Sequence, residues 1–149
     1  MEMKVEIPNF EKILVKFEDI PGQAKDNVLI ELVNIANDLK NEMITSMENS
    51  PATGRKYKRG VGYHTASSPY NPPRRMDGGL IGGFELDIDS VHLSVEVGNI
   101  IKDPDYPRYL EEGTPRMLPR PYIQPAIDNM EYNMKSRIMN AIRNSVRGA

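Results

Sequence analysis

Residues 84–97 read FELDIDSVHLSVEV and alternate apolar with polar side chains through two short runs. This period of two is typical of strands that bury one face. The polar pair Asp89-Ser90 separates the runs and favours a tight turn, after which the second run extends from Val91 to Val97. The stretch therefore predicts an antiparallel hairpin.

Long stretches with a helical period lie on both sides of this hairpin in the sequence. From Gln23 to Glu48, apolar residues recur three or four positions apart, and Pro51 follows shortly after, where a helix should already have ended. A second helix is predicted from about Tyr122 or Pro125 to Arg147. The apolar stripes expected to be buried are Leu29, Leu32, Val33, Ala36, Leu39, Met43 and Met47 in the first helix, and Ile123, Ile127, Met130, Met134, Ile138, Ala141 and Ile142 in the second.

The N-terminal residues carry two weaker signals. Alternation over residues 3–7 predicts a short strand that stops at Pro8. The spacing of apolar residues from Phe10 to Phe17, after Asn9 as a candidate N-cap, predicts a short helix. The run of residues 13–15 is also compatible with a strand.

These elements predict an α+β fold. We expect one antiparallel sheet of three to four strands, packed against the helix of residues 23–48 and the helix of residues 125–147. The 149 residues match the usual length of one domain, so a single domain over residues 1–149 is expected, with a flexible basic arm at about 50–79. The chain has no cysteine, which excludes a disulfide scaffold, a Cys-ligated metal and thiol catalysis. No run of about 18 apolar residues occurs, so we expect no membrane partner.

Charge is distributed in blocks of alternating sign. Residues 1–49 carry a net charge of −5, residues 50–79 carry +5, residues 80–115 carry −6 and residues 116–149 carry +4. Surfaces of opposite charge favour association between copies of a chain, because their electrostatic attraction guides the copies together.

The block at residues 50–79 has neither a strand nor a helix period, and it is rich in proline, glycine and tyrosine. A short flexible β-hairpin is possible within it. We interpret it as an arm that contacts neighbouring subunits or partners, although a nucleic-acid-binding segment and a solvated loop are alternatives. The candidate contact residues are Arg55, Lys56, Tyr57, Lys58, Arg59, Tyr63, Arg74 and Arg75.

A second irregular region, with six prolines, spans residues 104–125. Within it, Tyr106–Glu112 predicts a helical turn that ends at Gly113. Residues 114–121 should be extended, because prolines at 119 and 121 cannot occupy a central strand.

The sequence offers little for catalysis. His64 and His92 are the two histidines, and neither lies in a recognisable nucleophile motif. The carboxylates of Asp87, Asp89 and Glu96 could serve a metal-dependent nuclease, but we favour an acidic strand edge. The expectation is a protein without enzymatic activity, metal or cofactor.

Two motifs are more specific. Residues 53–59 contain Thr53-Gly54-Arg55-x-Tyr57-x-Arg59, and residues 109–126 contain Tyr109-Leu110-Glu111-x-Gly113-Thr114 followed by Arg120-Pro121-Tyr122-x-x-Pro125-Ala126. With the two long helices, this pattern resembles the small head–tail joining, or tail-completion, proteins of long-tailed bacteriophages. The family-motif residues expected to set the local structure are Thr53, Gly54, Glu111, Gly113, Thr114, Arg120, Pro121 and Pro125.

The resemblance implies a structural role in the virion neck or tail, with assembly in the host cytoplasm. Family members form rings, often hexamers, that stack on connector and tail-tube proteins around the channel through which the phage DNA passes. A stopper or adaptor ring of the same connector is the nearest alternative.

Overall fold

The computed structural model describes residues 3–6, 10–15, 22–76, 78–101 and 105–147. They form two compact units. Unit 1 takes its described residues from Met1–Lys40, Glu85–Gly98 and Asn129–Ala149, and unit 2 takes its residues from Asn41–Phe84 and Asn99–Asp128.

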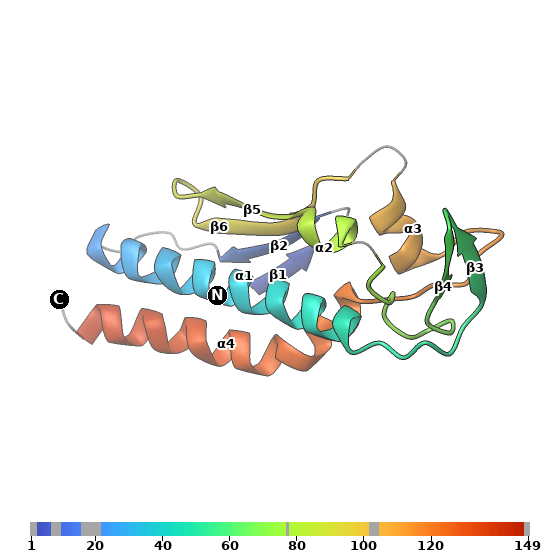
Figure 1. Cartoon of the computed structure of the whole chain (residues 1–149). Coiled ribbons are helices and arrows are strands. Elements are labelled where there is room, and N and C mark those ends of the chain that lie inside the picture. The colour runs from blue at the N-terminus through green and yellow to red at the C-terminus, as the bar shows by residue number, and fades with distance from the viewer. Residues whose placement is uncertain (1–2, 7–9, 16–21, 77, 102–104, 148–149) are drawn as a thin grey trace. The chain divides into compact units, whose positions relative to one another are not determined.

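The structure confirms the mixed α+β class (Figure 1). In chain order the elements are β1 (Met3–Glu6), β2 (Phe10–Val15), α1 (Gly22–Glu48), β3 (Lys56–Arg59), β4 (Gly62–Thr65), α2 (Gly79–Gly82), β5 (Phe84–Asp89), β6 (Ser94–Asn99), α3 (Tyr106–Glu112) and α4 (Ile123–Arg147). The helices predicted from residue 23 and from residues 122–125 are confirmed as α1 and α4, and the predicted turn at 106–112 is confirmed as α3. The short helix α2 was not predicted.

The sheet of unit 1 has the strand order β1-β2-β6-β5. β2 pairs with β1 on one side and with β6 on the other, both antiparallel, and Ile13 lies opposite Val95. The helix predicted from Phe10 is therefore wrong over residues 10–15, and its last residues lie outside the described part of the chain. A strand that gains hydrogen bonds from two neighbours outweighs a weak helical period, and β-branched residues such as Ile13 favour it.

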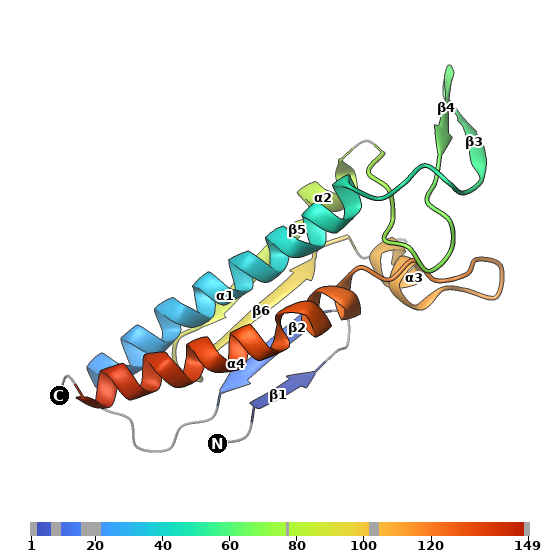
Figure 2. The same cartoon turned by 90° about the horizontal axis from the view of Figure 1, so that it is seen from below.

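Two helices cover one face of this sheet. Figure 2 shows the unit 1 parts of α1 and α4 side by side along β6 and β2. Among the residues of unit 1 whose burial is described, the buried apolar side chains belong to Ala24, Val28, Leu32, Ile35, Ala36, Leu39, Leu93, Val95, Val97, Met134 and Ile138. Leu29 and Val33, predicted to be buried, are half-buried, because the buried stripe of α1 runs through Val28 and Ile35 instead.

The β5–β6 turn is longer than predicted. β6 begins at Ser94 rather than Val91, and Val91 lies exposed in the turn. The Asp89 carboxylate causes this, since its Oδ1 accepts hydrogen bonds from the backbone N–H groups of Val91 at 2.9 Å and His92 at 3.0 Å. An aspartate that binds backbone groups two and three residues ahead stabilises a turn over them.

An ion-pair cluster joins α1 to α4 within unit 1. Arg137 donates from Nε to Glu31 Oε1 at 2.5 Å and from Nη1 to Asp38 Oδ2 at 2.6 Å. The Arg137 side chain is 29% exposed, and its hydrogen bonds, first to Asp38 and then to Glu31, raise the pKa of its guanidinium. Arg137 therefore holds two carboxylates of one helix from the other.

The substitution Arg137→Met is expected to lower the free energy of unfolding by about 1–2 kcal/mol, because the half-buried carboxylate of Glu31 and the exposed carboxylate of Asp38 lose their shared charged donor. Urea denaturation followed by circular dichroism measures this. Arg143→Met is the matched control, because Arg143 contacts only Asn140 in α4 among the residues described, at 3.5 Å. Equal effects of the two changes would contradict a stabilising role for the cluster.

Unit 2 combines short elements around a small core. Its buried apolar side chains are Met43, Met47, Phe84, Leu110, Tyr122, Ala126 and Ile127. The rings of Phe84 and Tyr122 meet edge to face with centroids 6.0 Å apart. The prediction that residues 114–121 are extended is wrong at its start, because Thr114 and Met117 pair across a tight turn.

Candidate functional site

The segment of residues 50–79 contains an exposed hairpin formed by β3 and β4. The sequence had allowed such a hairpin in the arm without predicting it firmly. Tyr57 pairs with His64 across the strands, and Gly60 at the tip has φ +58°, a conformation that glycine adopts without strain. Every residue of β3 is exposed, and Tyr63 of β4 is 68% exposed. A two-stranded hairpin with so little burial has marginal stability by itself.

Cations lie over the tyrosine rings of this hairpin. The Lys56 ammonium is 4.8 Å from the centroid of the Tyr63 ring, and the Arg55 guanidinium is 5.5 Å from that of Tyr57. Each such contact at an exposed site contributes about 0.5–1 kcal/mol. The hairpin thus presents tyrosine rings and positive charge together.

The base of the hairpin is closed by backbone contacts. The N–H of Gly54 donates to the carbonyl of Ala66 at 2.8 Å, and the Ala66 N–H donates to Arg55 at 3.0 Å. The Thr53 and Ser68 hydroxyls lie 2.8 Å apart. A Cβ at position 54 would lie 2.1 Å from the carbonyl oxygen of Ser67, so the close approach of the two chains requires glycine.

Arg120 ties the hairpin base to α3. Its Nε donates to the carbonyl of Ser67 at 3.1 Å, and its backbone N–H donates to Leu110 at 2.6 Å. The Arg120 residue is only 8% exposed. The carbonyl of Pro119 next to it accepts the N–H of Tyr70 at 2.8 Å. Three segments that are distant in sequence are joined at this point.

Glu111 caps the N-terminus of α4. Its Oε2 accepts the N–H groups of Tyr122 at 2.8 Å and Ile123 at 3.0 Å, and its Oε1 accepts that of Gln124 at 3.0 Å. Pro125 in the first helical turn has no N–H to satisfy. The backbone donors that a helix start leaves without intrahelical partners are therefore bound by one carboxylate, which also interacts favourably with the helix dipole.

Gly113 and Thr114 shape the connection from α3 to α4. Gly113 has φ +78°, and its N–H donates to Tyr109 at 2.9 Å, which ends α3. Thr114 and Met117 exchange backbone hydrogen bonds of 2.8 and 3.1 Å, and the Thr114 hydroxyl accepts the N–H of Arg116 at 3.2 Å. Pro121 follows, half-buried.

Two further arginines of the arm contact their own chain. Arg75 forms an ion pair with Glu48 of α1 at 2.9 Å, and its N–H donates to Met47 at 3.3 Å. Arg74 donates from Nη1 to the carbonyl of Thr65 in β4 at 3.1 Å. These contacts hold the segment of residues 66–76, which follows β4 and which we call the return path of the arm, against α1 and β4.

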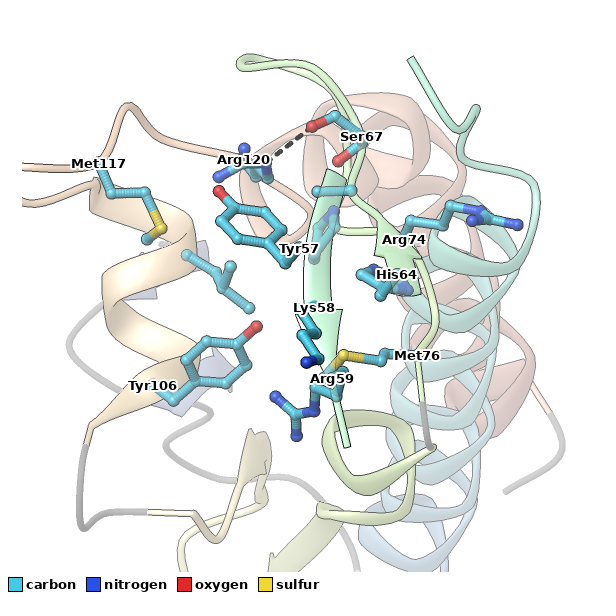
Figure 3. Close-up of a pocket in the computed structure, with 13 residues that line it drawn as sticks. Tyr57, Lys58, Arg59, His64, Ser67, Arg74, Met76, Tyr106, Met117 and Arg120 are labelled. Atoms are coloured by element: carbon cyan, nitrogen blue, oxygen red, sulfur yellow. Dashed lines mark hydrogen bonds between the residues drawn. The ribbon is translucent and has the colours of Figure 1, made fainter. Parts of the chain in front are cut away.

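A pocket of about 420 Å³ lies between the hairpin, the return path of the arm and α3 (Figure 3). It is lined by Tyr57, Lys58, Arg59, His64, Ala66, Ser67, Pro73, Arg74, Met76, Tyr106, Leu110, Met117 and Arg120. Four of these are Lys or Arg and none is Asp or Glu. Of these residues, the sequence had singled out Tyr57, Lys58, Arg59 and Arg74 as arm contacts and Arg120 as a motif residue. Tyr106, Leu110 and Met117 were not proposed for this site, because only the fold brings them to the arm.

The titratable residues considered for catalysis are dispersed. His64 lines the pocket in unit 2, whereas His92 belongs to the turn of unit 1, with Nδ1 2.6 Å from Asp89 Oδ2. The N–H of His92, and then its ring, lower the pKa of the Asp89 carboxyl. Asp87 is exposed on β5. In the part of the chain that the structure describes, His, Asp and Glu form no group of three that could hold a metal ion.

Comparison of the chain with protein-family models, with curated proteins and with solved structures gave no match. The likeness to phage tail-completion proteins therefore rests on the sequence motifs quoted above. Among the described helices, none combines the length and apolar character needed to cross a bilayer.

Proposed function

We propose that this chain is a structural subunit of a phage virion neck, a tail-completion or head–tail joining protein that assembles through its β3–β4 hairpin and performs no catalysis. The observation that carries the proposal is the hairpin itself. All of β3 and the Gly62–Tyr63 end of β4 are exposed, yet the hairpin base is held by Gly54, Ser67 and Arg120. The sequence motifs supply the family.

The composition of the hairpin suits a protein interface. Tyrosine and arginine are enriched at interfaces, where an aromatic ring contributes area and a guanidinium contributes directed hydrogen bonds. Tyr63 and Val61 are strongly exposed on this hairpin, beside Lys56, Lys58 and Arg59. A partner that covers these side chains would supply the burial that the hairpin lacks.

The fastened base lowers the cost of docking. An arm whose direction is already set loses less conformational entropy when it binds than a free segment does. Because Arg120 and Glu111 fix the hairpin base and the start of α4 to the same α3 region, the motif residues act as positioning residues for the arm. A small antiparallel sheet packed against the two long helices would form the rigid body of the subunit.

A ring follows from contacts between unlike surfaces. When one patch docks on a different patch of the next subunit, the contact repeats head to tail and can close into a ring. We propose a homo-oligomeric ring, with a hexamer favoured, that stacks on connector and tail-tube proteins and lets DNA pass without sequence recognition. A stopper or adaptor ring would use the same contacts.

A shortened hairpin tests the proposal. Replacement of Lys58–Tyr63 by Gly-Gly keeps Gly54, Ala66 and Ser67 in place, so we expect an unchanged circular dichroism spectrum and loss of the oligomer. Tyr63→Ser should weaken assembly about tenfold, because interface tyrosines contribute on the order of 1–2 kcal/mol. Light scattering after size exclusion and negative-stain imaging measure both.

Tyr132→Ser is the matched control, since Tyr132 is 88% exposed on α4 and lies away from the arm in sequence. An unchanged ring after hairpin shortening would refute assembly through the arm. A wild-type chain that stays monomeric at high concentration, alone and with connector proteins, would refute the whole proposal.

A second candidate, nucleic-acid binding, is favoured by one observation: the exposed face of the hairpin carries lysines beside tyrosine rings that bases could stack on. Filter binding with single-stranded DNA tests it. Submicromolar affinity that falls steeply with salt would support this function.

A further inference from the structure

Among the described residues that line the pocket of unit 2, four are Lys or Arg and none is Asp or Glu. The Lys58 side chain forms no hydrogen bond or ion pair with another described residue, and Arg74 gives only one of its donors to Thr65. Arg120 brings a third cation, which is buried. Cations gathered in a hollow with low-dielectric walls produce a strong local potential that favours an anionic occupant.

The other side chains that line the pocket indicate which kind of molecule would fit it. Leu110, Met76 and Met117 contribute apolar side chains to the lining, which together we call its apolar wall. Ser67 also lines it, with a fully buried hydroxyl that has no hydrogen-bond partner among the described residues. A bare phosphate would leave the apolar wall uncovered, whereas a polypeptide strand with carboxylate and aliphatic side chains would use both.

β5 of unit 1 has these properties. It is an edge strand of the sheet, so one side of its backbone faces no described strand. Glu85 and Asp87 are exposed, two residues apart and therefore on the same face, and Ile88 is 49% exposed. An exposed edge strand is a template for docking with another chain.

We infer that the pocket of one copy of this chain receives β5 of a second copy, with Asp87 and Glu85 placed against Lys58 and Arg74 and with Ile88 against the apolar wall. This inference rests on the proposed function and names the two surfaces that meet in the ring. The donor surface is in unit 1 and the acceptor surface is in unit 2, so the contact is heterologous and repeats from subunit to subunit.

Charge exchange tests the pairing in the full-length chain. Lys58→Glu and Asp87→Lys, each alone, should raise the dissociation constant of the oligomer by roughly tenfold or more, because each puts like charges together. The double variant should recover most of the wild-type affinity. Sedimentation velocity at low and high salt measures the constants, and Arg74→Glu repeats the test from a second pocket residue.

Lys25→Glu is the control, because Lys25 is exposed on α1 and the change in net charge is the same as for Lys58→Glu. The inference is overturned if Lys58→Glu behaves like Lys25→Glu, or if the double variant is no better than either single variant. In those cases loss of assembly on hairpin shortening would leave the proposed function standing.

Nucleic acid gives a distinct outcome. If Lys58→Glu abolishes binding of a single-stranded oligonucleotide but leaves self-association unchanged, the pocket serves nucleic acid and the pairing with β5 is wrong. If the wild-type chain and the Lys58→Glu variant bind the oligonucleotide equally while the variant loses self-association, the pairing with β5 is supported.

Discussion

Glu111→Ala is expected to lower the free energy of unfolding by about 2–3 kcal/mol, since three N–H groups at the start of α4 lose their charged acceptor at once. A single neutral N-cap contributes about 1 kcal/mol. Glu111 exceeds this because its carboxylate is half-buried, accepts three hydrogen bonds and lies at the positive end of the helix dipole. Chemical denaturation followed by circular dichroism gives the value.

Two variants make this measurement specific. Glu112→Ala removes the neighbouring carboxylate, which forms only an exposed ion pair with Arg108 at 2.9 Å, and should cost less than about 0.5 kcal/mol. Glu111→Gln keeps one acceptor oxygen without the charge and should fall between the two alanine variants. If Glu111→Ala and Glu112→Ala lower the free energy of unfolding equally, the hydrogen bonds from the start of α4 to Glu111 do not stabilise the protein.

Gly54→Ala is expected to open the base of the arm, with a loss of about 2–3 kcal/mol in local stability. The added methyl carbon would lie 2.1 Å from the Ser67 carbonyl oxygen, and backbone on both sides must shift to relieve this contact. The hydrogen bond from Gly54 to Ala66 would be lost first. Amide hydrogen exchange should therefore show faster exchange at residue 54 and at Ala66.

Gly62→Ala is the control in the same hairpin, because a Cβ there meets nothing closer than 4.0 Å and φ is not in the left-handed region. It should leave the exchange rates at residue 54 and Ala66 within about twofold of wild type. Unchanged exchange in Gly54→Ala would mean that the two chains separate there without cost, and the positioning role of the base would be refuted.

Where the sequence carried a long, regular pattern, it predicted structure well. The helix predicted over Gln23–Glu48 differs from α1 by one residue, and the short helix at Tyr106–Glu112 has the same bounds as α3. In α1 the period is sustained over many turns, so single exceptions do not change the outcome. In α3 the glycine that follows ends the helix where a positive φ is needed.

Where the apolar pattern was short or compatible with two structures, contacts outside the pattern determined the secondary structure. Residues 10–15 have a helical spacing, but the backbone of β2 pairs with β1 and β6, which no local pattern records. At the β5–β6 turn, the second alternating run begins at Val91, yet the Asp89 carboxylate holds the backbone of Val91 and His92 in the turn instead. In both places a hydrogen-bonding partner outside the apolar pattern determined the result.

In the candidate site, too, the sequence identified some of the residues, but it did not identify the groups that they contact. Gly54, Glu111 and Arg120 were singled out by a motif, but the motif does not say which groups they contact. Glu111 caps a helix that begins twelve residues later, and Arg120 reaches a carbonyl 53 residues away in the sequence. Such roles depend on distances in space.

By itself, the sequence determined the mixed class of the fold, the positions of three helices to within a few residues and the place of the basic arm, because these follow from local periodicity, turn chemistry and charge along the chain. Only the tertiary structure decided the pairing of β2 and the pocket where the arm meets α3. Those features arise when segments far apart in the chain are brought into hydrogen-bonding and packing distance, which the order of residues along the chain does not specify.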